Sequence, residues 1–188
     1  YVKGRCLSWD IIQIVSQDGW NVRDVSRFFI DYFDKLSHIA KSQGEAFLPT
    51  SHSVELSGSL YDCVPRNLVV AQDGTTVFID QEWVGTSPFE AGHILLRALM
   101  LPAAAFSGRP DQTSNEFDGT RLGLLQAVAA DLGWSLSKDQ IHAYAEREVA
   151  VFQEVLIHPP SIAEYIQWLD ESVTTRLHPE QQLADERI

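Results

Sequence analysis

The sequence predicts an α+β fold in which helices predominate and a small β-hairpin carries a group of polar residues. Three observations lead to this prediction. Apolar residues recur at three- and four-residue steps over residues 22–40, which is the spacing of an amphipathic helix. Two short apolar runs flank the dipeptide Asp73-Gly74, which indicates a hairpin. Two capping-box patterns, beginning at Ser137 and Ser161, indicate helices in the last third of the chain.

The first elements are expected to be two helices. Ser8 is predicted to cap a short helix that stops at Asp18-Gly19, and Asn21 to cap a long one that ends near Gly44. The long helix should bury one apolar stripe, because its apolar residues lie on one face. Residues 49–58 are rich in Ser, Thr and His, and they predict a loop.

The hairpin is expected to follow this loop. Its strands are the apolar runs 68–71 and 75–79, and Gln72-Asp73-Gly74 is its turn, with Asp-Gly supplying the positive-φ positions. Asn67 stands at the entry of the hairpin and Asp80 at its exit. Because the outer ends of an antiparallel ribbon are adjacent, we expect Asn67 and Asp80 to approach one another.

Helices are expected over most of the remaining chain. Residues 89–100 and 121–132 predict two helices, limited by Pro102 and Gly133 respectively. The helices opened by Ser137 and Ser161 are separated by a His-Pro-Pro run at 158–160. We therefore expect a single domain over residues 1–178, with a helical C-terminal extension, and a frayed charged tail over residues 179–188.

Composition excludes several classes of function. A formal charge of −12 and a pI near 4.8 argue against a nucleic-acid partner, which needs clustered Lys and Arg. The sequence contains no apolar run of about 18 residues, so it predicts no transmembrane segment. Its start lacks a signal-peptide pattern. We therefore expect a cytoplasmic protein. Cys6 and Cys63 form no C-x-x-C pair and are expected to be buried thiols, and the His residues show no zinc-ligand spacing.

Three polar residues around the hairpin suggest phosphoryl-transfer chemistry. Asp62 precedes Asn67 by five positions, and Asp80 follows an apolar strand. This chemistry needs a carboxylate to accept a hydroxyl proton, and an amide and a second carboxylate to hold the metal that bridges the nucleotide phosphates. The alternatives are ordinary ones: Asp62 as a loop aspartate bonded to its own backbone, and Asn67 as a residue that ties the turn.

The segment 56–99 resembles the C-terminal lobe of protein-kinase-like phosphotransferases of the aminoglycoside and choline type. The resemblance implies that Asp62 is the catalytic base and that Asn67 and Asp80 bind Mg²⁺ and, through it, the nucleotide. Leu60-Tyr61 stands in place of the His-Arg of protein kinases, and Gln81-Glu82-Trp83 in place of Phe-Gly. The closer likeness is to kinase-like modules attached to methyltransferases or glycosyltransferases of bacterial surface-polysaccharide synthesis, with a hydroxyl of a small molecule or glycan as acceptor.

The resemblance also implies an upstream part. The nucleotide of this fold lies beneath an N-terminal lobe with a Gly-rich loop, and this chain contains no G-x-G-x-x-G pattern. We therefore expect a lobe of a longer polypeptide with a covalently attached upstream domain, and ATP binding only with the missing N-lobe. A non-catalytic, degenerate kinase-like module that scaffolds an attached methyltransferase or glycosyltransferase is the alternative.

Two further residues near the trio have open roles. Glu82 would share the face of Asp80 in an extended segment, and either contacts substrate or metal or forms a structural bond to Arg97 or His93. Arg66 either neutralises phosphate or pairs with an acidic side chain. Both are therefore possible substrate-contacting or supporting residues.

Overall fold

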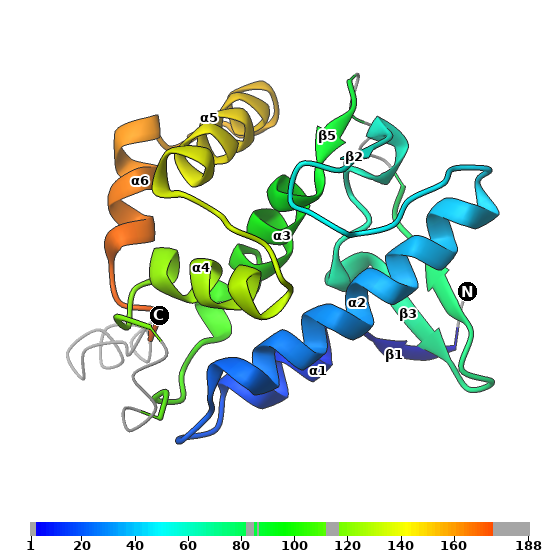
Figure 1. Ribbon diagram of the computed structural model, residues 1–188, viewed down its shortest axis with the longest axis horizontal. Coiled ribbons are helices and arrows are strands. Elements are labelled where there is room, and N and C mark those ends of the chain that lie inside the picture. Colours follow the sequence, from blue (N-terminus) through cyan, green and yellow to red (C-terminus); the bar gives the residue numbers. More distant parts are fainter. Residues whose placement is uncertain (1–2, 82–84, 86, 112–116, 175–188) are drawn as a thin grey trace.

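The computed structural model describes residues 3–81, 85, 87–111 and 117–174 (Figure 1). These residues form an α+β fold in which helices predominate, as the sequence predicts. The α-helices of the described residues are α1 (Ser8–Val15), α2 (Val22–Ser42), α3 (Ala91–Met100), α4 (Arg121–Asp131), α5 (Lys138–Val155) and α6 (Ile162–Asp170). The strands are β1 (Gly4–Cys6), β2 (Glu55–Leu56), β3 (Leu68–Ala71), β4 (Thr76–Phe78) and β5 (Phe89–Glu90). The expected tail 179–188 lies outside the described residues.

The two N-terminal helices form where the sequence predicts them, but one cap differs. The Asn21 side chain accepts a hydrogen bond from the Asp24 backbone N–H at 3.0 Å, as expected of an N-cap. Helix α1 instead has Leu7 as its N-cap, and Ser8 is already helical, so the predicted Ser8 cap is wrong. The reason is tertiary: the Leu7 backbone N–H donates to Leu68 O of β3 at 2.8 Å, which fixes the chain one residue earlier.

The hairpin lies within a three-stranded antiparallel sheet of order β1-β3-β4. Leu68 pairs with Phe78 and Val70 with Thr76, so both predicted strands are confirmed, β3 with the predicted bounds and β4 one residue shorter at each end. Strand β1 was not predicted, because three residues are too few to show an alternating pattern. It lies at an edge of the sheet, where Arg5 pairs with Val70 (Figure 1).

The turn of the hairpin is wider than a two-residue turn. Ala71 N donates to Thr75 O at 2.8 Å, so residues 72–74 lie within the loop. Gly74 has φ +84°, whereas Asp73 does not have a positive φ. The expectation that both residues supply positive φ is therefore wrong for Asp73, because a longer loop needs only one left-handed residue. The Asp73 carboxylate instead accepts from the Thr75 N–H at 2.9 Å.

A second small sheet replaces part of a predicted loop and part of a predicted helix. Strand β2 pairs antiparallel with β5, joining Leu56 to Phe89. The predicted loop 49–58 thus contains a short strand, and the helix expected from residue 89 begins only at Ala91. Two-residue strands give no periodicity, so only long-range pairing defines them.

Helix α3 forms the centre of the helical body. All ten of its residues are buried, and it packs against α4 and α5 (Figure 1). Helix α5 approaches closely at Gly92, where the Tyr144 ring fills the space that a β-carbon would need. Both predicted capping boxes are present, at Ser137 with Gln140 and at Ser161 with Glu164. The close contact of Gly92 with Tyr144 therefore packs α5 directly against α3.

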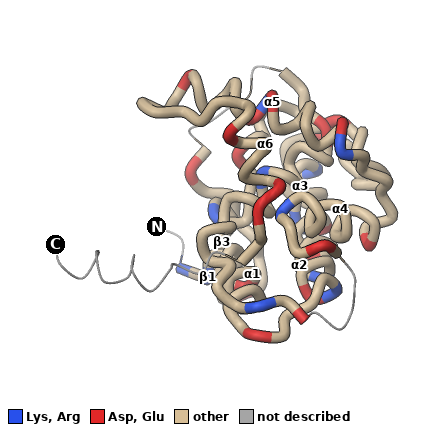
Figure 2. The backbone as a smooth tube through the Cα atoms, turned by 90° about the vertical axis from the view of Figure 1, so that its left-hand side faces the viewer, with Lys and Arg blue, Asp and Glu red and all other residues tan. Residues whose placement is uncertain are grey.

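The acidic charge is spread over several elements rather than gathered in one place (Figure 2). Asp and Glu positions occur on helices and on connecting segments in that view, with Lys and Arg interspersed. Among the described residues, no helix combines the length and the apolar character needed to cross a membrane.

Candidate functional site

Asp62 and Asn67 are in direct contact. Two 3₁₀ turns, Gly58–Leu60 and Pro65–Asn67, fold the segment so that the Asn67 side chain turns back on Asp62. Asn67 Nδ2 donates to Asp62 Oδ2 at 2.7 Å and to the Asp62 backbone O at 2.9 Å. Both side chains are buried. The five-residue spacing in the sequence therefore corresponds to a closed, hydrogen-bonded loop.

This contact fixes the orientation of the Asn67 amide. A carboxylate only accepts hydrogen bonds, so the amide nitrogen must face Asp62. The amide oxygen Oδ1 then points away from Asp62 and is the atom left to accept a bond or to bind a cation. Oxygen is the donor atom that Mg²⁺ prefers.

Asp80 follows the strand that pairs with the strand after Asn67. Ile79 N donates to Asn67 O at 2.8 Å, which extends the β3–β4 ladder by one residue. Asp80 is the next residue, and its side chain is exposed. Its φ of +55° makes it the one non-glycine residue of the described chain with a positive φ. Side chains disfavour this conformation, although Asp tolerates it better than most.

Asp62 is also paired with a buried arginine. Arg97 of α3 donates from Nη2 to Asp62 Oδ1 at 2.9 Å, and both side chains are 3% exposed. With Asn67 on Oδ2, each carboxylate oxygen of Asp62 has a donor. Arg66 lies on the solvent side, 53% exposed, with Nη2 at 3.9 Å from Asp62 Oδ1. The acidic side chain next to Arg66 is therefore that of Asp62.

Arg97 is shared with a second buried carboxylate, Glu148 of α5. Arg97 Nη1 donates to Glu148 Oε1, and Arg97 Cζ lies 4.4 Å from the centre of the Tyr61 ring. Glu148 Oε2 accepts from the Tyr61 hydroxyl at 2.8 Å and from His93 Nε2 at 3.1 Å. A continuous polar network therefore joins α5, α3 and the Asp62 loop inside the core.

The network shifts the pKa values of its members in opposite directions. Burial alone would raise the pKa of Glu148, but the His93 hydrogen bond and the charge of Arg97 outweigh it and lower that pKa below its usual value. Burial raises the pKa of Tyr61 far above its ordinary range, and the negative charge of Glu148 raises it further. Glu148 is thus held ionised and Tyr61 neutral, each suited to its hydrogen bond.

Four of the five site residues that the sequence predicts lie within the described part of the chain. Asp62, Asn67, Asp80 and Arg66 all lie on the loop and hairpin around the β3–β4 ladder. Glu82 lies outside the described residues. The role of Glu82 therefore stays a prediction; among the described residues, its suggested partner Arg97 contacts Asp62, and its suggested partner His93 contacts Glu148.

Sequence reasoning did not find Arg97 and Glu148 as parts of the Asp62 environment. Arg97 lies in the otherwise apolar run Ile94–Met100, and a charged side chain inside a buried helix requires a partner. That signal shows that a buried acid exists but not which one. Glu148 carries no comparable signal, because α5 has several acidic residues and its buried face is set by packing.

The described residues offer no group of three or more His, Cys, Asp or Glu side chains that could hold a metal ion. Asn67 Oδ1 and the Asp80 carboxylate remain as candidate oxygen donors. A site of one carboxylate and one amide suits Mg²⁺ better than zinc, since Mg²⁺ usually keeps several waters and takes further ligands from substrate phosphates.

Cys63 is buried beside Asp62, as predicted. Burial raises the pKa of its thiol well above the usual range, and the Asp62 charge adds to the shift. A thiol that resists ionisation is a poor nucleophile, so packing accounts for Cys63. Cys6 is only partly buried, with Sγ 3.1 Å from Arg66 O, so the expectation of a buried thiol is right for Cys63 alone.

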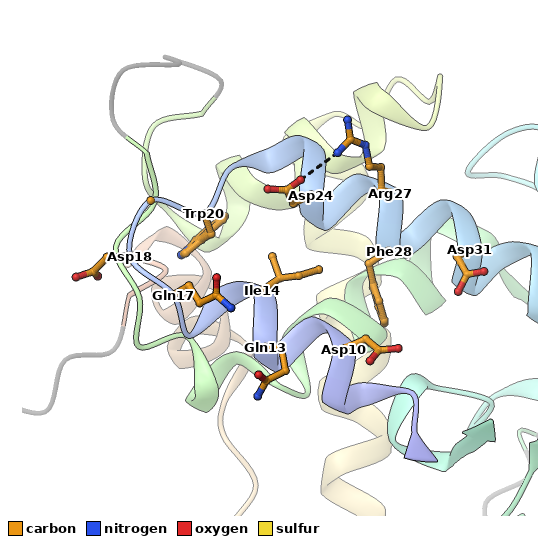
Figure 3. A pocket seen from close by; sticks show the side chains of 11 residues that line it. Asp10, Gln13, Ile14, Gln17, Asp18, Trp20, Asp24, Arg27, Phe28 and Asp31 are labelled. Carbon is orange, nitrogen blue, oxygen red and sulfur yellow. Dashed lines mark hydrogen bonds and ion pairs between the residues drawn. The ribbon is translucent and has the colours of Figure 1, made fainter. Parts of the chain in front are cut away.

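A separate hollow of about 540 Å³ lies between α1 and α2 (Figure 3). It is lined by four acids together with polar and apolar side chains. Each acid has a partner: Asp10 pairs with Arg5, Asp24 with Arg27, Asp31 with Lys35, and Asp18 accepts from Arg109 N. The acids of this hollow are therefore accounted for by contacts within the chain.

Comparisons of the chain with protein-family models, with curated proteins and with solved structures find no match.

Proposed function

We propose that this chain is the C-lobe of a Mg²⁺-dependent, kinase-like phosphotransferase that acts on a hydroxyl of a small molecule or glycan. The observation that carries the proposal is the 2.7 Å contact between Asn67 and Asp62, at the foot of the ladder that leads to Asp80. Residues 62–80 thus supply a base candidate, an amide oxygen and a second carboxylate. Phosphoryl transfer uses these three groups.

Each residue has a defined task in the proposed reaction. The acceptor oxygen forms a bond to the γ-phosphorus of ATP, and the bond from that phosphorus to the β,γ-bridging oxygen breaks as ADP leaves. The hydroxyl proton passes to the Asp62 carboxylate. Arg97 and Asn67 orient that carboxylate, and the exposed Arg66 is the proposed group that neutralises phosphate charge.

The proposed metal would be held by Asn67 Oδ1 and Asp80. These donors fit Mg²⁺ because the Asn67 nitrogen is already committed to Asp62 and the Asp80 side chain is exposed. When bound, Mg²⁺ would neutralise the negative charge that develops on the transferred phosphate. Glu82, which lies outside the described residues, is the proposed additional contact to substrate or metal.

A second function is supported by a specific observation. Asp62 is 2% exposed, and both of its carboxylate oxygens accept hydrogen bonds. A general base must come within hydrogen-bond reach of the proton that it accepts. A chain that keeps Asp62 closed would be a non-catalytic kinase-like module that scaffolds an attached methyltransferase or glycosyltransferase.

Phosphate transfer from ATP in the full-length protein tests the leading proposal. Asp62→Asn and Asp80→Ala should each abolish transfer while circular dichroism shows an intact fold. Asp73→Ala is the matched control, because Asp73 is an exposed acid at the tip of the same hairpin. Transfer at the wild-type rate in either site variant would refute the assigned role.

Thermal stability with Mg²⁺ and ATP separates the two functions. We expect a stabilised upstream-extended form and little effect on the 188-residue chain alone, because the phosphates need a second lobe. Stabilisation that Asp80→Ala removes would support metal-linked nucleotide binding. Absence of any response in both forms would favour the scaffold.

A further inference from the structure

The Arg97 guanidinium is held on three sides. Glu148 accepts from Nη1, Asp62 accepts from Nη2, and the Tyr61 ring covers its face at 4.4 Å. Because the guanidinium is planar and rigid, fixing Nη1 and the face also fixes the direction in which Nη2 donates. Glu148 of α5 fixes Nη1, so the orientation of the Asp62 carboxylate depends on Glu148 as well as on Arg97.

Glu148 also binds Tyr61, the residue before Asp62. The Tyr61 hydroxyl donates to Glu148 Oε2 at 2.8 Å, and His93 occupies the same oxygen at 3.1 Å. Glu148 thus reaches the Asp62 loop by two routes, one through Arg97 and one through Tyr61. Glu148 itself is 1% exposed, so water cannot easily replace it.

We propose that Glu148 is a positioning residue for Asp62, acting through Arg97 and Tyr61. It holds the Asp62 carboxylate in the orientation that Asn67 completes on the other oxygen. The kinetic consequence of this role rests on the proposed phosphotransfer, whereas the effect on the Asp62–Asn67 contact does not.

The competing explanation is that Glu148 only attaches α5 to α3. Loss of a buried charge would then lower stability and leave the Asp62–Asn67 contact as it is. The two explanations differ at Asn67: within the described part of the chain its side chain has no bond to Glu148, and the network reaches it through Asp62.

The test is the NMR signal of the Asn67 side-chain amide in the 188-residue chain. A short hydrogen bond to a carboxylate moves the donor proton downfield, so this signal reports the 2.7 Å contact. We expect Glu148→Gln, which keeps the volume but removes the charge, to shift the Asn67 signal. Glu146→Gln is the matched control on the exposed face of α5 and should leave the signal in place.

Kinetics of the full-length protein provide the second measurement. Glu148→Gln should lower kcat for phosphate transfer by about 10- to 100-fold with KM for ATP unchanged, since misplacing a reacting group affects the transition state more than ground-state binding. If the wild type shows no transfer but Glu148→Gln shifts the Asn67 signal, the proposed function fails and the positioning role stands.

A milder variant covers the case in which Glu148→Gln does not fold. Tyr61→Phe removes one donor from Glu148 and keeps the ring beneath Arg97, and it should shift the Asn67 signal in the same direction by a smaller amount. An Asn67 signal that stays at its wild-type position in each variant that folds would overturn the proposal.

Discussion

Arg97 and Asp62 form an ion pair 2.9 Å long in which both side chains are 3% exposed. Arg97 comes from the centre of a buried helix, and Asp62 from a loop that is 35 residues earlier in the chain. Arg97 also serves Glu148, so one guanidinium compensates two buried carboxylates. The core of this protein is therefore organised around charge as well as around apolar packing.

Removal of Glu148 should strongly destabilise the fold. Glu148→Ala leaves Arg97 with one anionic partner fewer in the core, and breaking a buried pair in this way costs about 3–5 kcal/mol. Urea denaturation should show this loss in the free energy of unfolding. The neighbouring Glu146→Ala, on the exposed face of α5, should change it by less than about 0.5 kcal/mol. Equal effects of the two substitutions would contradict the buried network.

Stability should also fall in acid because of Glu148. The pKa of Glu148 is lowered in the folded state, so the unfolded chain binds more protons as the pH drops. Its contribution is fully present above the ordinary glutamate pKa of about 4.3 and is lost as the pH falls from there toward the folded value. Unfolding free energies measured from pH 7 to pH 3 should decline more steeply in the wild type than in Glu148→Gln. Identical slopes would show that Glu148 is not the titrating group.

Asp80 should be retained at a cost to stability. Its φ of +55° favours glycine, so Asp80→Gly should raise the free energy of unfolding by about 0.5–1 kcal/mol. Asp80→Asn, which tolerates this conformation, should be nearly neutral and serves as the control. Chemical denaturation of the three proteins provides the comparison. If the proposed function holds, the more stable glycine variant should have no phosphotransfer, and a stable, active glycine variant would remove Asp80 from the site.

The Asn21 cap should contribute a smaller, local stabilisation. Its side chain accepts from Asp24 N at the start of α2, and replacing such a cap by Ala costs about 0.5–2 kcal/mol. Thermal unfolding of Asn21→Ala should show this loss, and Asn21→Ser should recover most of it. A Ser8→Ala substitution should lack a comparable capping effect, because Leu7 is the N-cap of α1. A large loss of stability in Ser8→Ala would contradict that assignment.

Local signals explain which elements the sequence predicts. Asn21 and the two capping boxes mark helix starts, because a side chain satisfies the first free N–H groups within three residues. The hairpin is predictable for a similar reason, since its turn and its two apolar runs are adjacent in the chain. Strand β1 and the β2–β5 pair depend on partners that are distant in sequence, and no local pattern marks them.

In the candidate site too, local contacts are predictable from the sequence and long-range contacts are not. The Asp62–Asn67 pair is predictable from a five-residue spacing, and its contact is local. The partnership of Asp62 with Arg97, and of Arg97 with Glu148, depends on how α3 and α5 pack, over separations of 35 and 51 residues. A buried arginine in an apolar helix predicts that an acidic side chain lies near it, but the chain has 26 Asp and Glu residues and the sequence does not indicate which of them is the partner.

The most direct measurement of the central claim is paramagnetic broadening of assigned NMR signals by Mn²⁺, used as a substitute for Mg²⁺. If Asn67 Oδ1 and Asp80 share a cation, low Mn²⁺ concentrations should broaden the Asn67 side-chain amide and the Asp80 backbone amide before Gly74 at the tip of the hairpin, and Asp80→Ala should abolish the effect. Broadening that is centred on the paired acids between α1 and α2, or that is unchanged in Asp80→Ala, would contradict a metal site at Asn67 and Asp80.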